Sequence, residues 1–161
     1  MNQDDISKST LSFLNDLLRK FHKKYPDTQI TGLACEVSLE VGALYVFLCN
    51  QESDNSLAVD LWPLQFVEQD FSSLRPLKWK SEFDALLESY YNESVDYSEI
   101  ESAINILLKG VSKALNLLVT NMNLPELGFI PDPVISVFTA DDDNINIGIQ
   151  RVKDAQSING I

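Results

Sequence analysis

The longest helical pattern in the chain lies over residues 98–122, and it constrains the fold more than any other feature. Residues 98–101 (Ser-Glu-Ile-Glu) resemble a capping box, and Gly110 costs this helix about 1 kcal/mol relative to alanine. We expect the central core helix here, ending before Pro125. Apolar side chains mark one face at helical spacing: Ile100, Ile104, Leu107, Leu108, Val111, Leu115, Leu118 and Met122.

Two further segments predict helices. Residues 4–25 carry an apolar stripe with acids at the beginning and bases at the end, as the helix dipole favours, and Pro26 stops the pattern. Residues 81–91 open with Ser-Glu-Phe-Asp, a second sequence that resembles a capping box.

Residues 30–37 and 43–49 are rich in β-forming residues and predict a hairpin. In that hairpin Cys35 faces residues 45–47 and Cys49 lies near residues 31–33, so the two thiols are not opposed. We therefore expect both cysteines to be reduced and buried.

Residues 57–62 predict a third strand ended by Pro63, residues 63–80 an irregular crossing segment, and residues 134–138 a strong strand. Residues 144–157 fit either a strand or a helix. Ile145, Ile147 and Ile149 alternate as in a strand, whereas Ile145, Ile149 and Val152 also fit a helix, which we favour.

These elements predict an α+β fold with a mainly antiparallel sheet of about four strands packed against helices. The length of 161 residues indicates a single globular domain over residues 1–161.

The formal net charge of −12 argues against nucleic acid as a direct partner, because the field of the protein repels phosphate. The first residues are acidic where a signal peptide needs bases, and the longest purely apolar stretch has seven residues, residues 43–49. We expect a cytoplasmic protein with no membrane contact.

The arrangement of the charges is more informative than their sum. Twenty of the 24 acids lie in three windows without any base, residues 25–74, 81–108 and 114–150, whereas four of the twelve bases lie in residues 19–24. This pattern predicts a polarised molecule whose negative face attracts a cationic protein partner, or else serves solubility alone.

Motifs for catalysis, metal ions and cofactors fail on inspection. A calcium loop that starts at Asp142 has Ile147 where glycine is needed and Lys153 where glutamate is needed. His22, the sole histidine, stands among lysines and predicts an exposed surface position. We expect no catalytic residue, metal or cofactor, although paired carboxylates leave a small enzyme as an alternative.

Aromatic residues offer a weaker signal. Trp62, Trp79, Tyr90 and Tyr91 fit either an aromatic binding surface or core packing, and core packing is the commoner use.

The order of elements carries a resemblance. A helix ending in residues 23–26 (Lys-Lys-Tyr-Pro) precedes a hairpin, a Leu-Trp-Pro step at residues 61–63, a long helix and the strand at residues 134–138, which leads into an acidic run. This order resembles an uncharacterised family of small bacterial cytoplasmic domains. The chain is also similar in size and charge to immunity proteins of contact-dependent and other polymorphic toxin systems, although its tail is isoleucine-rich and contains Gly148.

The resemblance implies that the chain neutralises one cognate toxin domain, often a basic nuclease, by covering its active face. A generic protein-binding adaptor is a further alternative, and it needs an exposed apolar groove. The candidate contact residues are seven acids and one aromatic anchor: Glu52, Asp54, Trp62, Glu68, Asp70, Asp141, Asp142 and Asp143.

Overall fold

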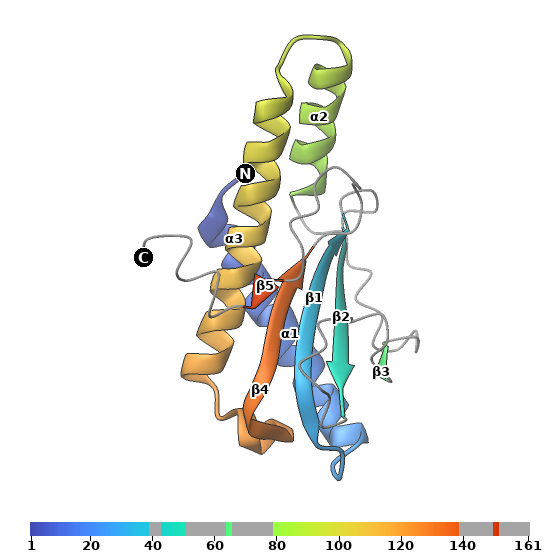
Figure 1. The fold of residues 1–161 in the computed structure, drawn as a ribbon, viewed down its shortest axis with the longest axis vertical. Helices are drawn as coiled ribbons and strands as arrows, with labels where there is room; N and C mark the ends of the chain where they lie inside the picture. The colour runs from blue at the N-terminus through green and yellow to red at the C-terminus, as the bar shows by residue number, and fades with distance from the viewer. Residues whose placement is uncertain (39–42, 51–63, 66–78, 139–149, 152–161) are drawn as a thin grey trace.

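The computed structural model describes residues 1–38, 43–50, 64–65, 79–138 and 150–151. Three α-helices, one 3-10 helix and five strands follow one another in these ranges (Figure 1): α1 (Gln3–Lys24), β1 (Ile30–Ser38), β2 (Ala43–Cys49), β3 (Leu64–Gln65), α2 (Lys80–Tyr91), α3 (Tyr97–Asn121), η3 (Leu124–Leu127), β4 (Phe129–Phe138) and β5 (Gln150–Arg151).

The strands form one mixed sheet in the order β3-β2-β1-β4-β5. The α+β class is confirmed, but the mainly antiparallel sheet is only partly right, because the neighbouring long strands β1 and β4 are parallel. Parallel strands need a long crossover, and the chain between β2 and β4 includes α2 and α3. Two of the five strands, β3 and β5, have only two described residues each.

The hairpin and its cysteines are confirmed. β1 pairs antiparallel with β2, with Cys35 opposite Val46 and Cys49 opposite Gly32. Both cysteines are free and buried. Burial raises the pKa of the Cys35 thiol far above its ordinary value, because the apolar interior disfavours the thiolate.

One predicted strand boundary and two segments without a favoured strand need correction. The strand predicted over residues 134–138 begins at Phe129, and β4 accommodates Pro131 and Pro133 where its register against β1 shifts between Ile30 and Gly32. Such an irregularity tolerates a residue that cannot donate a ladder hydrogen bond. Residues 64–65, predicted to be irregular, and residues 150–151, predicted by preference to be helical, instead form short edge strands. The strand predicted over residues 57–62 lies outside the described residues.

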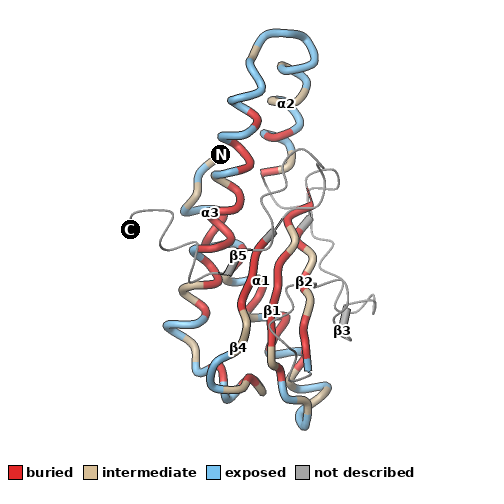
Figure 2. The backbone as a smooth tube through the Cα atoms, in the orientation of Figure 1, coloured by how far each residue is buried: buried red, intermediate tan, exposed pale blue. Residues whose placement is uncertain are grey.

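The main hydrophobic core lies between one face of the sheet and the helices α1 and α3 (Figures 1 and 2). Leu33, Cys35 and Val37 alternate along β1 toward this core, as the period of two in a strand requires. α1 contributes seven buried residues and α3 eleven, so the two predicted apolar stripes are confirmed. Ala34 and Cys49 are buried in a smaller cluster of their own.

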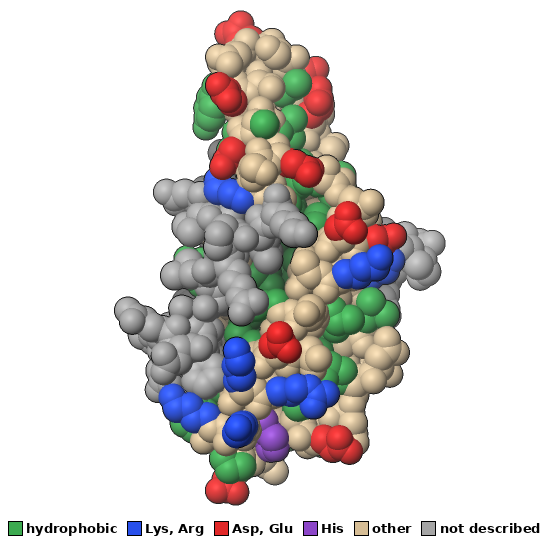
Figure 3. Space-filling model, turned by 180° about the vertical axis from the view of Figure 1, so that it is seen from behind, with side chains coloured by type: hydrophobic (Ala, Val, Ile, Leu, Met, Phe, Trp, Pro, Cys, Tyr) green, Lys and Arg blue, Asp and Glu red, His purple; other side chains and the backbone are tan. Residues whose placement is uncertain are grey.

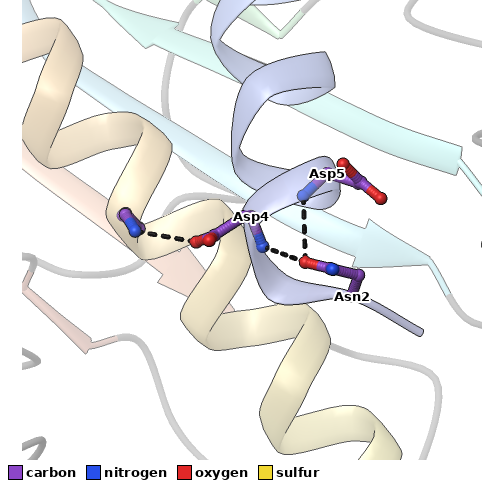
Figure 4. Close-up of polar contacts among 4 residues, drawn as sticks. Asn2, Asp4 and Asp5 are labelled. Carbon is purple, nitrogen blue, oxygen red and sulfur yellow. Dashed lines mark hydrogen bonds and ion pairs between the residues drawn. The ribbon is translucent and has the colours of Figure 1, made fainter.

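The helix starts differ from the prediction. Asn2 caps α1, because its Oδ1 accepts hydrogen bonds from the backbone N–H groups of Asp4 at 2.8 Å and Asp5 at 3.4 Å (Figure 4). The two predicted capping boxes are wrong: α2 follows Trp79 and α3 follows Asp96, and neither of these residues makes a side-chain cap hydrogen bond.

Gly110 lies where α3 packs tightly against the first turns of α1. A Cβ atom at this position would lie 2.6 Å from Cγ2 and 2.8 Å from Cβ of Ile6, well inside van der Waals contact. The glycine that weakens the helix locally therefore allows the two helices to pack.

Candidate protein-binding surface

The structure leaves the eight predicted contact residues undescribed, so their role stays a prediction. All lie outside the described residues: Glu52, Asp54, Trp62, Glu68, Asp70, Asp141, Asp142 and Asp143. The acidic window at residues 81–108 is described, and it shows how this protein presents negative charge.

Helix α2 and the beginning of α3 form a helical hairpin that extends past the end of the sheet (Figures 1 and 2). We name residues 80–101 the acidic arm. Phe83 is the one buried residue of α2, and Leu86 and Leu87 are partly buried against the core. Every acid of the arm is exposed: Glu82, Asp84, Glu88, Glu93, Asp96, Glu99 and Glu101.

Two acids nearest the core are neutralised by cations, and the others are not. Glu82 lies 2.6 Å from the amino group of Met1, and Asp84 pairs with Lys80 one turn earlier. Among the described residues, no cation lies within ion-pair distance of the other five acids of the arm. The end of the arm therefore carries uncompensated negative charge, which attracts a cationic partner over long distances.

Three tyrosines gather at the same end of the arm. The ring centroid of Tyr90 lies 5.7 Å from that of Tyr91 and 5.9 Å from that of Tyr97. Tyr91 is 76% exposed, and Tyr90 and Tyr97 are more than a third exposed. Tyrosine is enriched at protein interfaces because its ring buries apolar area while its hydroxyl forms a hydrogen bond.

The predicted aromatic surface thus divides into two parts. Trp79 is 4% exposed and packs edge-on against Phe83 at 6.3 Å, so it belongs to the core. Tyr90 and Tyr91 face solvent, together with Tyr97, which the sequence reasoning did not single out. The sequence signal for Tyr97 is its place directly after Asp96, the cap of α3, and only a few residues after the end of α2.

The turn between α2 and α3 holds an acid in a conformation that favours glycine. Glu93 has φ of 56°, its N–H donates to the carbonyl of Tyr90, and the N–H of Ser94 donates to the carbonyl of Ser89. This is the Schellman ending of a helix, in which glycine is usual at the left-handed position. A glutamate here costs stability and places a carboxylate at the end of the arm.

The opposite end of the molecule, which we call the basic end, carries the bases of the last turns of α1. Figure 3 shows mostly acids toward the arm, whereas at the basic end lysines, arginines and the histidine lie among several acids. The described residues thus show an acidic helical arm, whereas the acids predicted as contact residues lie outside the described residues. The exposed histidine is a wrong prediction: His22 is half-buried, and its Nδ1 is enclosed near Gly128.

Other kinds of site find little support in the described part of the chain. No group of three or more potential metal ligands occurs there. Helix α3 is long and apolar enough to cross a membrane, but 56% of its most apolar window is buried within the fold, as in the core helix of a soluble protein.

Comparison with protein-family models, curated proteins and solved structures found no match.

Proposed function

We propose that this chain is a cytoplasmic immunity protein that binds and neutralises a basic toxin domain through an acidic surface. The observation that supports this proposal is the acidic arm, with five exposed acids that lack a cationic partner in the described structure and with three exposed tyrosines beside them.

The arm supplies the two contributions that a tight, specific complex needs. Its carboxylates steer a cationic partner and raise the association rate, an effect of roughly one to three orders of magnitude at low salt. Its tyrosines supply apolar contact area, which slows dissociation. Against a nuclease, the carboxylates would occupy the positions that bind substrate phosphates.

The arm is also well placed for contact with another protein. It extends past the sheet, and its acids and tyrosines are exposed, so the core tolerates variation of these surface residues. A surface of this kind allows partner specificity to change while the fold is retained.

The direct test is co-expression with the toxin domain encoded beside this gene. We expect cells that make both proteins to grow and cells that make the toxin alone to stop growing. We also expect the purified proteins to bind with an affinity that falls as salt increases. Loss of growth in both strains, with no complex detected by calorimetry at low salt, would contradict the proposal.

A further inference from the structure

A cavity of about 350 Å³ lies at the basic end, where the last turns of α1 and α3 meet η3. This volume is at the lower end of the range for small-molecule sites. The polar residues of its wall come from all three elements: Arg19, His22, Lys23, Asn121, Asn123 and Glu126.

The charge of this wall is positive in a strongly acidic protein. Arg19 and Lys23 contribute two full charges, and Glu126 is the one acid among the lining residues. The carboxylate of Glu126 accepts a hydrogen bond from the side-chain amide of Asn123 at 2.6 Å. It is thus engaged by a neutral donor, while Lys23 has no ion-pair partner within the described ranges.

Hydrogen-bond donors remain available in the same wall. Arg19 donates through Nε to Asn15 at 2.8 Å, which leaves the other N–H groups of its guanidinium. Nδ1 of His22 is buried with no hydrogen-bond partner in the described structure. Because Nδ1 is enclosed, Nε2 is the ring nitrogen of His22 that is open to a ligand.

Bases at the end of α1 also offset the negative end of the helix dipole. That role requires only that they lie near the last carbonyls. It does not account for a concave wall shared with α3 and η3, which an arginine, a lysine and a histidine line together.

We infer that this cavity binds a small oxyanion, namely the phosphate or carboxylate group of a small molecule. Arginine and lysine form charge-assisted hydrogen bonds with both groups. The guanidinium of arginine can also donate two parallel hydrogen bonds to two oxygens of one phosphate or carboxylate. This site lies at the end of the molecule opposite the acidic arm, and its existence does not depend on the proposed immunity function.

The sole histidine makes the test direct, because the imidazole of His22 gives one set of NMR signals. We would titrate the full chain with sodium phosphate and, separately, sodium succinate, each against sodium chloride at matched ionic strength. A saturable shift of the His22 signals with phosphate or succinate, absent with chloride, is expected. Saturation by one salt alone identifies which oxyanion the site accepts.

Lys23→Gln should weaken the binding at least about tenfold, since it removes a charge-assisted hydrogen bond. Lys8→Gln is the matched control, because Lys8 is another exposed lysine of α1 that does not line the cavity. Shifts that are linear and equal to those of chloride would overturn the inference, as would equal weakening by the two substitutions. Unchanged binding in Lys23→Gln would also overturn it.

Discussion

The acidic arm and the helical core are built from neighbouring parts of the same chain, yet different forces hold them. α1 buries seven residues, whereas α2 buries only Phe83. α3 belongs to both regions, because its first turns carry exposed acids and its later turns fill the core. The core is thus specified by apolar burial. The acids of the arm repel one another, but the cost in stability is low because they stay in water.

Truncating a core side chain should show the largest contrast between the two regions. Leu115 is fully buried, so Leu115→Ala should lower the free energy of unfolding by about 2–5 kcal/mol. Tyr91→Ala, on the exposed arm, should change it by no more than about 0.5 kcal/mol. Urea denaturation followed by circular dichroism measures both values, and similar losses would mean that the arm is part of the core.

Gly110→Ala tests whether helix packing or helix propensity dominates at the centre of the core. The new methyl group would meet Ile6, and such overpacking costs about 1–3 kcal/mol, more than the gain of up to about 1 kcal/mol in propensity. We expect a net loss of stability. Asn105→Ala, at an exposed position of the same helix, is the control and should be neutral or stabilising.

Glu93→Gly should separate stability from binding within the arm. Glycine relieves the left-handed backbone at this position, so the free energy of unfolding should rise by about 1 kcal/mol. Removing the carboxylate should at the same time weaken binding to the toxin domain. Ser94→Gly, one residue further on, should lower stability slightly. A stability loss in Glu93→Gly would show that the left-handed turn is not the constraint described here.

The smallest effect concerns the ion pair that joins α1 to α3. Lys113 lies 2.8 Å from the carboxylate of Asp4 and, by hydrogen bond and charge, lowers the pKa of Asp4 below its ordinary value of 3.8. The stabilisation is present above the pKa of the unfolded chain and is lost as the pH falls through the lowered folded pKa. Because both groups are exposed, the effect is small. Lys113→Met should return the pKa of Asp4 toward 3.8 in an NMR titration, and an unchanged value would rule out the pair.

Much of this fold is predictable from sequence because its elements have strong local signals. The stripes of α1 and α3 follow the helical period, and the hairpin register follows from its length, so Cys35 is correctly opposite residues 45–47. The parallel pairing of β1 and β4 depends on a contact about a hundred residues apart, which no local pattern encodes. The failed capping boxes show the same limit, because α2 begins after Trp79, a buried residue that packs against Phe83 and makes no side-chain cap hydrogen bond.

The sequence predicts that the candidate site is an acidic surface, but it does not predict where that surface lies in the fold. The base-free window at residues 81–108 indicates negative charge, but its presentation on a projecting hairpin depends on tertiary packing. His22 was misjudged, since its lysine neighbours indicate exposure while the turn at Gly128 encloses one edge of its ring. No signal in α1 alone reveals that contact.

Two charge-matched variants test whether the arm itself binds the cationic partner. Glu93→Gln/Asp96→Asn/Glu99→Gln neutralises three acids of the arm, and Asp5→Asn/Asp16→Asn/Asp27→Asn neutralises three exposed acids elsewhere. Isothermal titration calorimetry with the toxin domain encoded beside this gene, at low and moderate salt, measures the affinity of each. We expect the arm variant to bind at least about tenfold more weakly with a reduced salt dependence, and the control to stay within about threefold of the original protein. Equal weakening by the two variants, or none in the arm variant, would contradict it.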